Sequence, residues 1–207
     1  MQARLVRATM GRRWHVFRVL PLLSFVIPAV WLAAFTSNST GAQNTAFDLT
    51  GNPVDPLKSA GGKVVALVFV RTDCPVSNRY APTIQKLSAS LAGKVAFWLV
   101  YPSKSESAEV IRKHELEYGY KIPALRDPQH VLVRESQVEI TPEVAVFDSR
   151  GHLVYHGRID NLYEDIGRAR TVATTHELED AIAAALSGKS LAESATHGVG
   201  CYISDVE

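Results

Sequence analysis

The stretch that decides the fold is Val64-Val-Ala-Leu-Val-Phe-Val-Arg-Thr-Asp-Cys-Pro-Val-Ser-Asn-Arg-Tyr-Ala-Pro82. Its first part, Val64 to Val70, is apolar without alternation, which is typical of a strand covered on both faces. Thr72 and Asp73 are favoured N-terminal cap residues, and proline is tolerated in the first turn of a helix. The stretch therefore predicts a buried strand that leads directly into a helix beginning near Cys74.

A thiol at the start of a helix has an unusual electrostatic environment. It lies beside unpaired amide N–H groups and the positive end of the helix dipole, and both favour thiolate over thiol. The alternative interpretation is an unreactive cysteine that packs as a small hydrophobic side chain. The position of Cys74 between an apolar strand and a proline favours the nucleophile.

Bulk composition excludes several classes of protein. The chain has 207 residues, a formal net charge of +1 and 21% charged residues. It contains no basic stripe with interleaved aromatic residues, so we expect no nucleic-acid partner. Cys74 and Cys201 are its two cysteines, which is too few for a small fold held together by disulfides.

The N-terminal residues 1–42 resemble an export signal. Arginines at positions 4, 7, 12, 13 and 18 precede an uncharged run from Val19 to Phe35, and Gly41-Ala42 offers a small-residue cleavage site. The alternative is an uncleaved anchor that tethers the protein to a membrane, although the uncharged run is shorter than the roughly 20 residues that a spanning helix needs. Both interpretations predict an exported protein, periplasmic or otherwise extracytoplasmic, in a compartment where disulfides persist.

Two regular elements are expected after the first strand and helix. Pro82 should kink the helix that follows Cys74. Val95–Tyr101 is a second apolar run and predicts a second buried strand. Ser103-x-x-Glu106 fits a capping box and predicts the start of an amphipathic helix that continues to residue 118.

The second half of the domain predicts a hairpin and a final helix. Residues 122–130 have no regular pattern, and residues 131–138 fit a short helix. Val144–Phe147 and Leu153–His156 flank a Ser-Arg-Gly turn and should pair as a hairpin. Thr174-x-x-Glu177 fits a second capping box and predicts the start of the last helix.

The order of these elements predicts the architecture. Parallel strands come first and a hairpin comes last, which indicates a three-layer α/β/α sandwich with a central mixed sheet. We expect this domain to occupy residues 43–192, between the N-terminal segment and a C-terminal tail, residues 193–207, that carries Cys201.

Three features together resemble the thioredoxin-like superfamily, and in particular its peroxiredoxin-like redoxin (AhpC/TSA) branch in exported bacterial form. Cys74-Pro75 follows a hydrophobic strand, Pro82 stands where thioredoxins have a kinking proline, and Thr141-Pro142 precedes a later strand. The resemblance covers about residues 46–190. It implies that the Thr141–Pro142 bond is cis and that Thr141 presents backbone groups to a bound thiol or disulfide.

The motif also departs from both branches. Thioredoxins have Cys-x-x-Cys, whereas this chain has Ser77 at the second position, which can donate a hydrogen bond to a thiolate but cannot form a disulfide. Leu67 and Arg71 occupy the proline and threonine positions of typical peroxiredoxins. Thr72, Arg71 and Arg79 are therefore the supporting residues expected to substitute in part.

Cys201 lies in a glycine-flanked tail without a helix or strand pattern, so a disordered end with an incidental thiol is one interpretation. The other follows from the resemblance to peroxiredoxins with two cysteines, in which a C-terminal thiol resolves the oxidised first one. Resolution within one chain and resolution between the subunits of a homodimer both fit the sequence.

The first functional hypothesis is an exported thiol oxidoreductase with antioxidant or disulfide-exchange activity. Cys74 would attack a protein disulfide or a small peroxide, Cys201 would resolve the product, and an external reductant would reopen the disulfide. Thr141 and Pro142 complete the predicted catalytic set. This hypothesis requires no cofactor.

The second hypothesis is a binding protein that resembles the copper-delivery factors of thioredoxin fold. Thiolates and imidazole suit Cu(I), so Cys74, Cys201 and His197 would be the ligands. Those factors use Cys-x-x-x-Cys, and here Asn78 occupies the second cysteine position. A domain that binds through a single thiol without turnover is the third interpretation.

Overall fold

The computed structural model describes residues 46–204. The expected signal peptide or anchor, residues 1–42, lies outside the described residues and stays a prediction. Within residues 46–204, no helix is long and apolar enough to cross a membrane.

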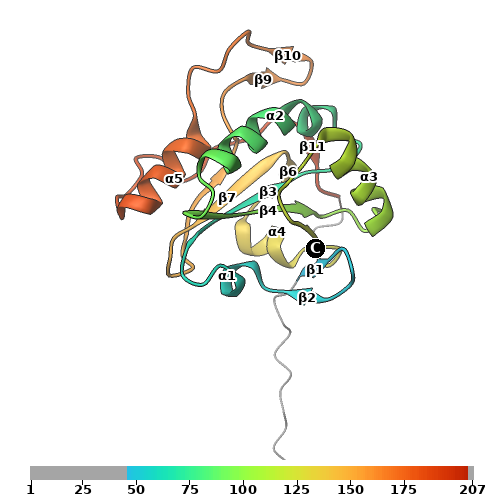
Figure 1. Cartoon of the computed structure of the whole chain (residues 1–207). Coiled ribbons are helices and arrows are strands. Elements are labelled where there is room, and N and C mark those ends of the chain that lie inside the picture. Colours follow the sequence, from blue (N-terminus) through green and yellow to red (C-terminus); the bar gives the residue numbers. More distant parts are fainter. Residues whose placement is uncertain (1–45, 205–207) are drawn as a thin grey trace, which may run out of the picture. The chain divides into compact units, whose positions relative to one another are not determined.

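A seven-stranded mixed sheet forms the centre of the domain (Figure 1). Its strands, in spatial order, are β2 (Pro53–Val54), β1 (Ala46–Asp48), β5 (Ala124–Arg126), β4 (Val95–Tyr101), β3 (Val64–Phe69), β7 (Glu143–Phe147) and β8 (Leu153–Gly157). Strands β3, β4 and β5 are parallel, whereas β7 pairs antiparallel with β3, and β8 antiparallel with β7. The predicted hairpin and the mixed sheet are both confirmed.

Helices cover both faces of this sheet. They are α1 (Pro56–Ser59), α2 (Pro75–Ser90), α3 (Ala108–Tyr118), α4 (Val131–Ser136) and α5 (Glu177–Ser187). Alternate residues of β3 belong to two separate cores: Val68 shares one with α2, α3 and α5, and Leu67 shares the other with α4. Figure 1 shows α2 and α3 on one side of the sheet and α4 on the other. The expected three-layer sandwich is therefore present.

Both predicted capping boxes are wrong. Helix α3 begins after Ser107, whose hydroxyl caps it, because the Glu106 carboxylate instead accepts a hydrogen bond from the Thr72 backbone N–H at 2.7 Å. Helix α5 begins after His176 rather than Thr174, and Glu177 is engaged by a nearby arginine. Both glutamates that the local pattern assigned to helix caps thus bind groups elsewhere in the fold, Thr72 and Arg158.

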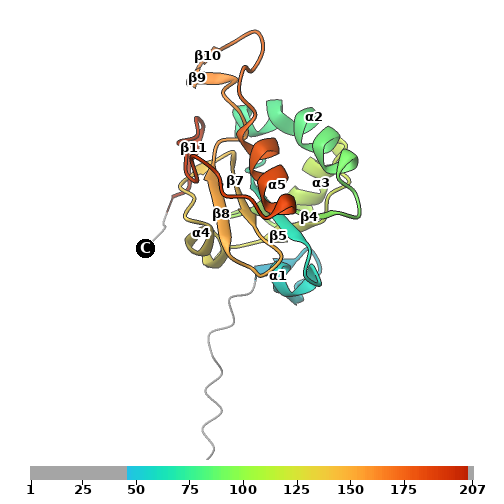
Figure 2. The ribbon, with the colours of Figure 1, turned by 90° about the vertical axis from the view of Figure 1, so that its left-hand side faces the viewer.

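Several short strands were not predicted from the sequence. Strand β5 lies in the segment expected to be irregular, where pairing with β4 supplies its ladder. Strands β9 (Tyr163–Asp165) and β10 (Arg168–Ala169) form a separate hairpin. Strand β11 (Cys201–Tyr202) pairs with β6 (Ile140–Thr141), and Figure 2 shows the chain after α5 returning past β8 to reach it.

Candidate functional site

Cys74 occupies the position before the first turn of α2. The predicted helix start near Cys74 is confirmed, with Pro75 at the first helical position, but the N-cap residue is Cys74 itself rather than Thr72 or Asp73. Its side chain is fully buried, and its sulfur lies 3.2 Å from the backbone carbonyl oxygen of Thr141. The end of β3 and the start of α2 therefore present the thiol to a loop far away in the sequence.

That loop is the turn between β6 and β7. The Thr141–Pro142 peptide bond is cis, which agrees with the expectation. Thr141 is itself fully buried, and its carbonyl accepts the hydrogen bond from the Cys74 thiol. Thr141 and Cys74, predicted to share a site, are thus in direct contact.

The C-terminal tail brings Cys201 to the same place. Cys201 stands opposite Thr141 in the antiparallel pair of β11 with β6, and the Thr141 hydroxyl donates to the Cys201 carbonyl at 3.3 Å. The Ile203 N–H donates to the Glu139 carbonyl at 2.9 Å and extends the pairing. The tail is therefore a docked strand at residue 201 rather than the disordered end considered as an alternative. Both cysteines are free thiols.

Two glycines let the tail approach the loop closely. A Cβ atom at Gly200 would stand only 2.0 Å from the Thr141 carbonyl oxygen. A Cβ atom at Gly198 would stand 2.8 Å from the Glu143 side chain. Since real Cβ atoms do not approach so closely, a larger residue at either position would push the tail away from the loop.

Glu143 holds the loop and the tail together. One carboxylate oxygen accepts from the Gly198 N–H at 2.9 Å, and the other accepts from the N–H groups of Glu139 at 2.9 Å and Ile140 at 3.2 Å. Its side chain is almost fully buried, at 3% exposure. Hydrogen bonds to three N–H groups compensate for burying this carboxylate.

The tail is also anchored before it reaches the thiols. Its backbone pairs with His156 on β8, whose N–H donates to Ser194 and whose carbonyl accepts from Thr196, both at 3.1 Å. The Thr196 hydroxyl lies 2.6 Å from the Tyr155 hydroxyl and accepts from the Arg158 N–H at 3.1 Å. The contacts run from residue 194 to residue 203, so the tail is an integral part of the site.

The two thiols differ in acidity. Burial alone would raise the pKa of Cys74, but hydrogen bonds from the Cys201 thiol and from the Ser77 side chain and N–H outweigh burial and lower that pKa. For Cys201, burial, the hydrogen bond to Cys74 and the charge of Cys74 raise the pKa to about 11. Cys74 is thus the more acidic thiol of the pair.

Of the predicted supporting residues Ser77, Arg71 and Arg79, the first two interact with the thiols and the third does not. The Ser77 hydroxyl is fully buried and makes no hydrogen bond to oxygen or nitrogen within residues 46–204, so its proton is available to the Cys74 sulfur. Arg71 donates to Asp73 at 2.8 Å, and its charge opposes the rise in the pKa of Cys201. Arg79 is exposed on α2, outside these contacts.

Thr72 acts through its backbone. Its N–H donates to Glu106, and its carbonyl accepts from the Asn78 side chain at 3.1 Å. Asn78 in turn lies 2.8 Å from His114, whose other ring nitrogen lies 2.9 Å from the Tyr101 hydroxyl. This buried chain of polar groups holds the segment that leads into Cys74.

Sequence reasoning missed Glu143, Glu106 and His114. Glu143 follows the Thr141-Pro142 pair directly, so its place in the chain offered a signal. Glu106 was assigned to a cap, and His114 had no distinguishing pattern. Their roles depend on partners that are 34 to 55 positions away in the chain.

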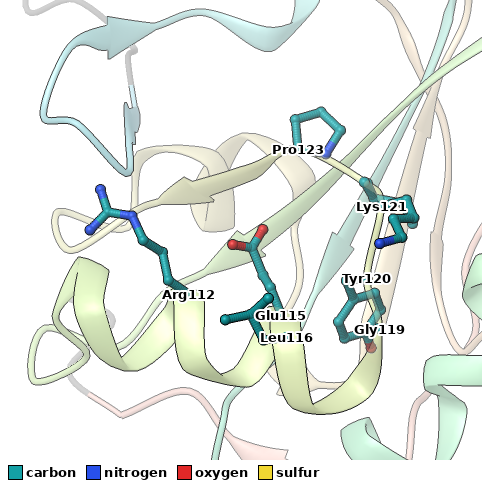
Figure 3. Close-up of a pocket in the computed structure, with 8 residues that line it drawn as sticks. Arg112, Glu115, Leu116, Gly119, Tyr120, Lys121 and Pro123 are labelled. Atoms are coloured by element: carbon teal, nitrogen blue, oxygen red, sulfur yellow. The ribbon is translucent and has the colours of Figure 1, made fainter.

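Across residues 46–204, no group of three or more His, Cys, Asp and Glu side chains is arranged to hold a metal ion. Cys74, Cys201 and His197 therefore do not form a three-ligand cluster. A pocket lined by Arg112, Glu115, Tyr120 and Lys121, between α3 and the start of β5, contains no thiol (Figure 3).

Comparison with known proteins agrees with this geometry. The Redoxin family matches residues 34–172, which is more than half of the chain. No curated protein matches the chain.

Solved structures show the same architecture. A hypothetical protein from Sinorhizobium meliloti is 22% identical with a TM-score of 0.65, over 77% of this chain and 88% of that one. An uncharacterized conserved protein from Geobacillus kaustophilus is 22% identical with a TM-score of 0.66, over 77% and 86%. A secreted disulfide oxidoreductase of Mycobacterium tuberculosis is 23% identical with a TM-score of 0.51, over 68% and 94%. The chain belongs to the Redoxin family and has a thioredoxin-like fold.

Proposed function

We propose that the protein is an exported thiol–disulfide oxidoreductase in which Cys74 is the nucleophile and Cys201 the resolving thiol. The observation that carries this proposal is the pairing of Cys201 with Thr141, which holds a second thiol against the buried Cys74 sulfur. The family match and the similar fold of a secreted disulfide oxidoreductase support it.

The first step forms a mixed disulfide. The Cys74 thiolate attacks one sulfur of a substrate disulfide, a new S–S bond forms, and the other substrate sulfur leaves as a thiolate that takes up a proton. The lowered pKa of Cys74 favours this step because the thiolate, not the thiol, is nucleophilic. Thr141 and Pro142 form the loop against which the substrate sulfur is oriented.

The second step resolves the intermediate. Cys201 loses its proton and attacks the Cys74 sulfur, which forms the Cys74–Cys201 disulfide and releases the second substrate thiol. Part of the rise in the pKa of Cys201 comes from the Cys74 charge, which is lost in the mixed disulfide. Resolution therefore becomes easier once the first step has occurred. The substrate gains two electrons, and an external dithiol reductant returns them to the protein.

Access to Cys74 requires the tail to move. The Cys74 side chain has no exposed surface, and the docked residues 194–203 cover the loop beside it. Release of β11 from β6 opens the nucleophile to a substrate, and its return brings Cys201 to the intermediate. Protein thiols and disulfides are the proposed partners.

Peroxide reduction is the finer version of the same proposal. The Cys74 thiolate would attack a peroxide oxygen, leave a sulfenic acid and release hydroxide or alkoxide, and Cys201 would then expel water as the disulfide forms. Peroxide reduction also needs donors that polarise the O–O bond, and Arg71, at the position of the motif threonine, instead donates to Asp73 at 2.8 Å. Disulfide exchange therefore fits the site better.

Copper binding is the alternative, and the adjacent sulfur atoms of Cys74 and Cys201 favour it because paired thiolates suit Cu(I). Metal analysis of the purified protein separates the two functions. Stoichiometric copper on isolation would support the binding protein, whereas metal-free protein that consumes disulfides supports the enzyme.

The direct test is turnover. Reduced protein is mixed with a model disulfide or with hydrogen peroxide, and free thiols are counted over time, with dithiothreitol as the external reductant for repeated cycles. We expect disulfide consumption faster than with Cys74→Ser by at least about 100-fold, since the variant lacks the thiolate. A wild-type rate equal to that of Cys74→Ser would overturn the proposal.

A further inference from the structure

A polar cavity of about 580 Å³ lies beside the tail that carries Cys201. Its lining comes from the β9–β10 hairpin and the residues before it, and from tail residues 197–199. Three arginines line it, Arg158, Arg168 and Arg170, together with Asn161. None of these groups takes part in the contacts that set the acidity of Cys74.

The charges in this cavity are unbalanced. Arg168 lies 3.2 Å and Arg170 2.7 Å from the carboxylate of Glu164. Two positively charged guanidinium groups therefore share one negative charge. Arg158 is neutralised separately by Glu177, which lies outside the cavity lining. The lining therefore keeps a net positive charge. A guanidinium that shares its carboxylate still has N–H donors for another anion.

The cavity is close to the reacting sulfurs along the tail. Val199 lines it and stands two residues before Cys201, at most about 7 Å away even in fully extended chain. Glu143, which binds the Gly198 N–H, fixes the tail between the cavity and the thiols. An anionic group that sits among the arginines is therefore within reach of a disulfide bond that is positioned at Cys74.

We propose that this cavity binds a carboxylate of the substrate, so that the protein prefers disulfides with an acidic group a few bonds away from the sulfur. This specificity rests on the proposed disulfide exchange at Cys74. Arg168 and Arg170 are the specificity-determining residues, and Glu164 limits their attraction for the anion.

The test uses two forms of one disulfide. Glutathione disulfide and its diester, in which both glycine carboxylates are ethylated, have the same peptide skeleton and the same sulfur leaving group, but the diester lacks two negative charges and carries two small ethyl groups. Initial rates of thiol loss are measured for the reduced protein with each form. Each rate is then divided by the rate at which a small free thiol reacts with the same form of the disulfide. The resulting acid-to-ester ratio isolates the effect of the carboxylates.

For the wild-type protein we expect a ratio of about 5 to 10 at low salt, falling toward 1 as salt screens the charges. Arg168→Gln with Arg170→Gln should bring the low-salt ratio close to 1. Glu164→Gln should raise it, and this opposite sign cannot arise from general loss of structure. Arg134→Gln with Arg150→Gln, two exposed arginines on α4 and in the β7–β8 turn, removes the same net charge and should preserve the ratio.

The outcomes separate the two proposals. Reaction with both forms at a ratio near 1, or a ratio unaffected by the Arg168 and Arg170 substitutions, would overturn the carboxylate site and leave the oxidoreductase intact. Failure of Cys74 to react with either form would overturn the proposed function itself, and the specificity with it.

Discussion

Cys201 and Thr141 face each other in a two-residue antiparallel ladder, and the Cys74 sulfur lies 3.2 Å from the carbonyl oxygen of the same Thr141. The same ladder covers Cys74, the proposed nucleophile, and carries Cys201, its proposed resolving partner. In this proposal, a strand from the other end of the chain supplies the second cysteine that the motif lacks.

The acidity of Cys74 depends on the tail. Cys201→Ala removes the thiol that donates to the Cys74 sulfur, so the pKa of Cys74 should rise. The pH dependence of alkylation, with modified Cys74 identified by mass spectrometry, measures this shift. Cys201→Ser keeps a hydroxyl donor and should preserve part of the lowering. An unchanged pKa in Cys201→Ala would contradict the role assigned to the contact.

The docking of the tail depends on Gly200. An alanine methyl group there would stand 2.0 Å from the Thr141 carbonyl oxygen, so Gly200→Ala should displace β11 and expose Cys74. We expect Cys74 to be alkylated about tenfold or more faster than in the wild type, because local opening is no longer required. Gly51→Ala is the control for general destabilisation, since its positive φ strains the alanine although the methyl group meets nothing within 4 Å. Equal acceleration in both variants would show that the effect is not local.

Glu143 should matter for stability because three backbone N–H groups donate to its buried carboxylate. Glu143→Ala leaves these donors without a partner and should lower the free energy of unfolding by about 2–4 kcal/mol. Glu143→Gln keeps one acceptor oxygen and should lose less. Urea denaturation followed by circular dichroism measures both. A loss below about 0.5 kcal/mol in Glu143→Ala would mean that the tail contributes little to the fold.

Glu106 should make stability depend on pH. Burial raises its pKa, although the Thr72 N–H partly opposes the shift. A carboxyl with a raised folded pKa binds its proton more tightly in the folded state, so the stability that it contributes is present below its unfolded pKa and is lost as pH rises through the folded pKa. In Glu106→Gln the side chain does not titrate, so the variant lacks this pH-dependent contribution to stability. The variant's stability relative to the wild type should therefore increase as pH rises above about 4.3, the unfolded pKa, and a flat difference would contradict this.

Much of the framework could be predicted from local pattern. Apolar runs located β3 and β4, and the thiol at the start of α2 followed from the residues around Cys74. The cis Thr141–Pro142 bond followed from resemblance rather than from any local signal. These features could be predicted because they are encoded by residues adjacent in the chain or by a motif of the family.

The docking of the tail could not be predicted in the same way. Cys201–Tyr202 has no period that marks a strand, and it becomes one only because β6 offers an unpaired edge. The sequence shows glycines at positions 198 and 200. It does not show that Glu143 and Thr141, which are distant in the chain, pack so closely against them that no larger side chain fits. The capping boxes failed for the same reason, since Glu106 has a stronger partner in Thr72.

The most direct test of the central claim is the location of the disulfide after oxidation. Reduced protein is treated with one equivalent of oxidant at low concentration, digested without reduction, and mapped by mass spectrometry alongside Cys201→Ser. We expect a Cys74–Cys201 crosslink within one chain, and in Cys201→Ser a mixed disulfide or sulfenic acid that persists at Cys74. Two free thiols after oxidation, or a crosslink found only between chains, would contradict the account.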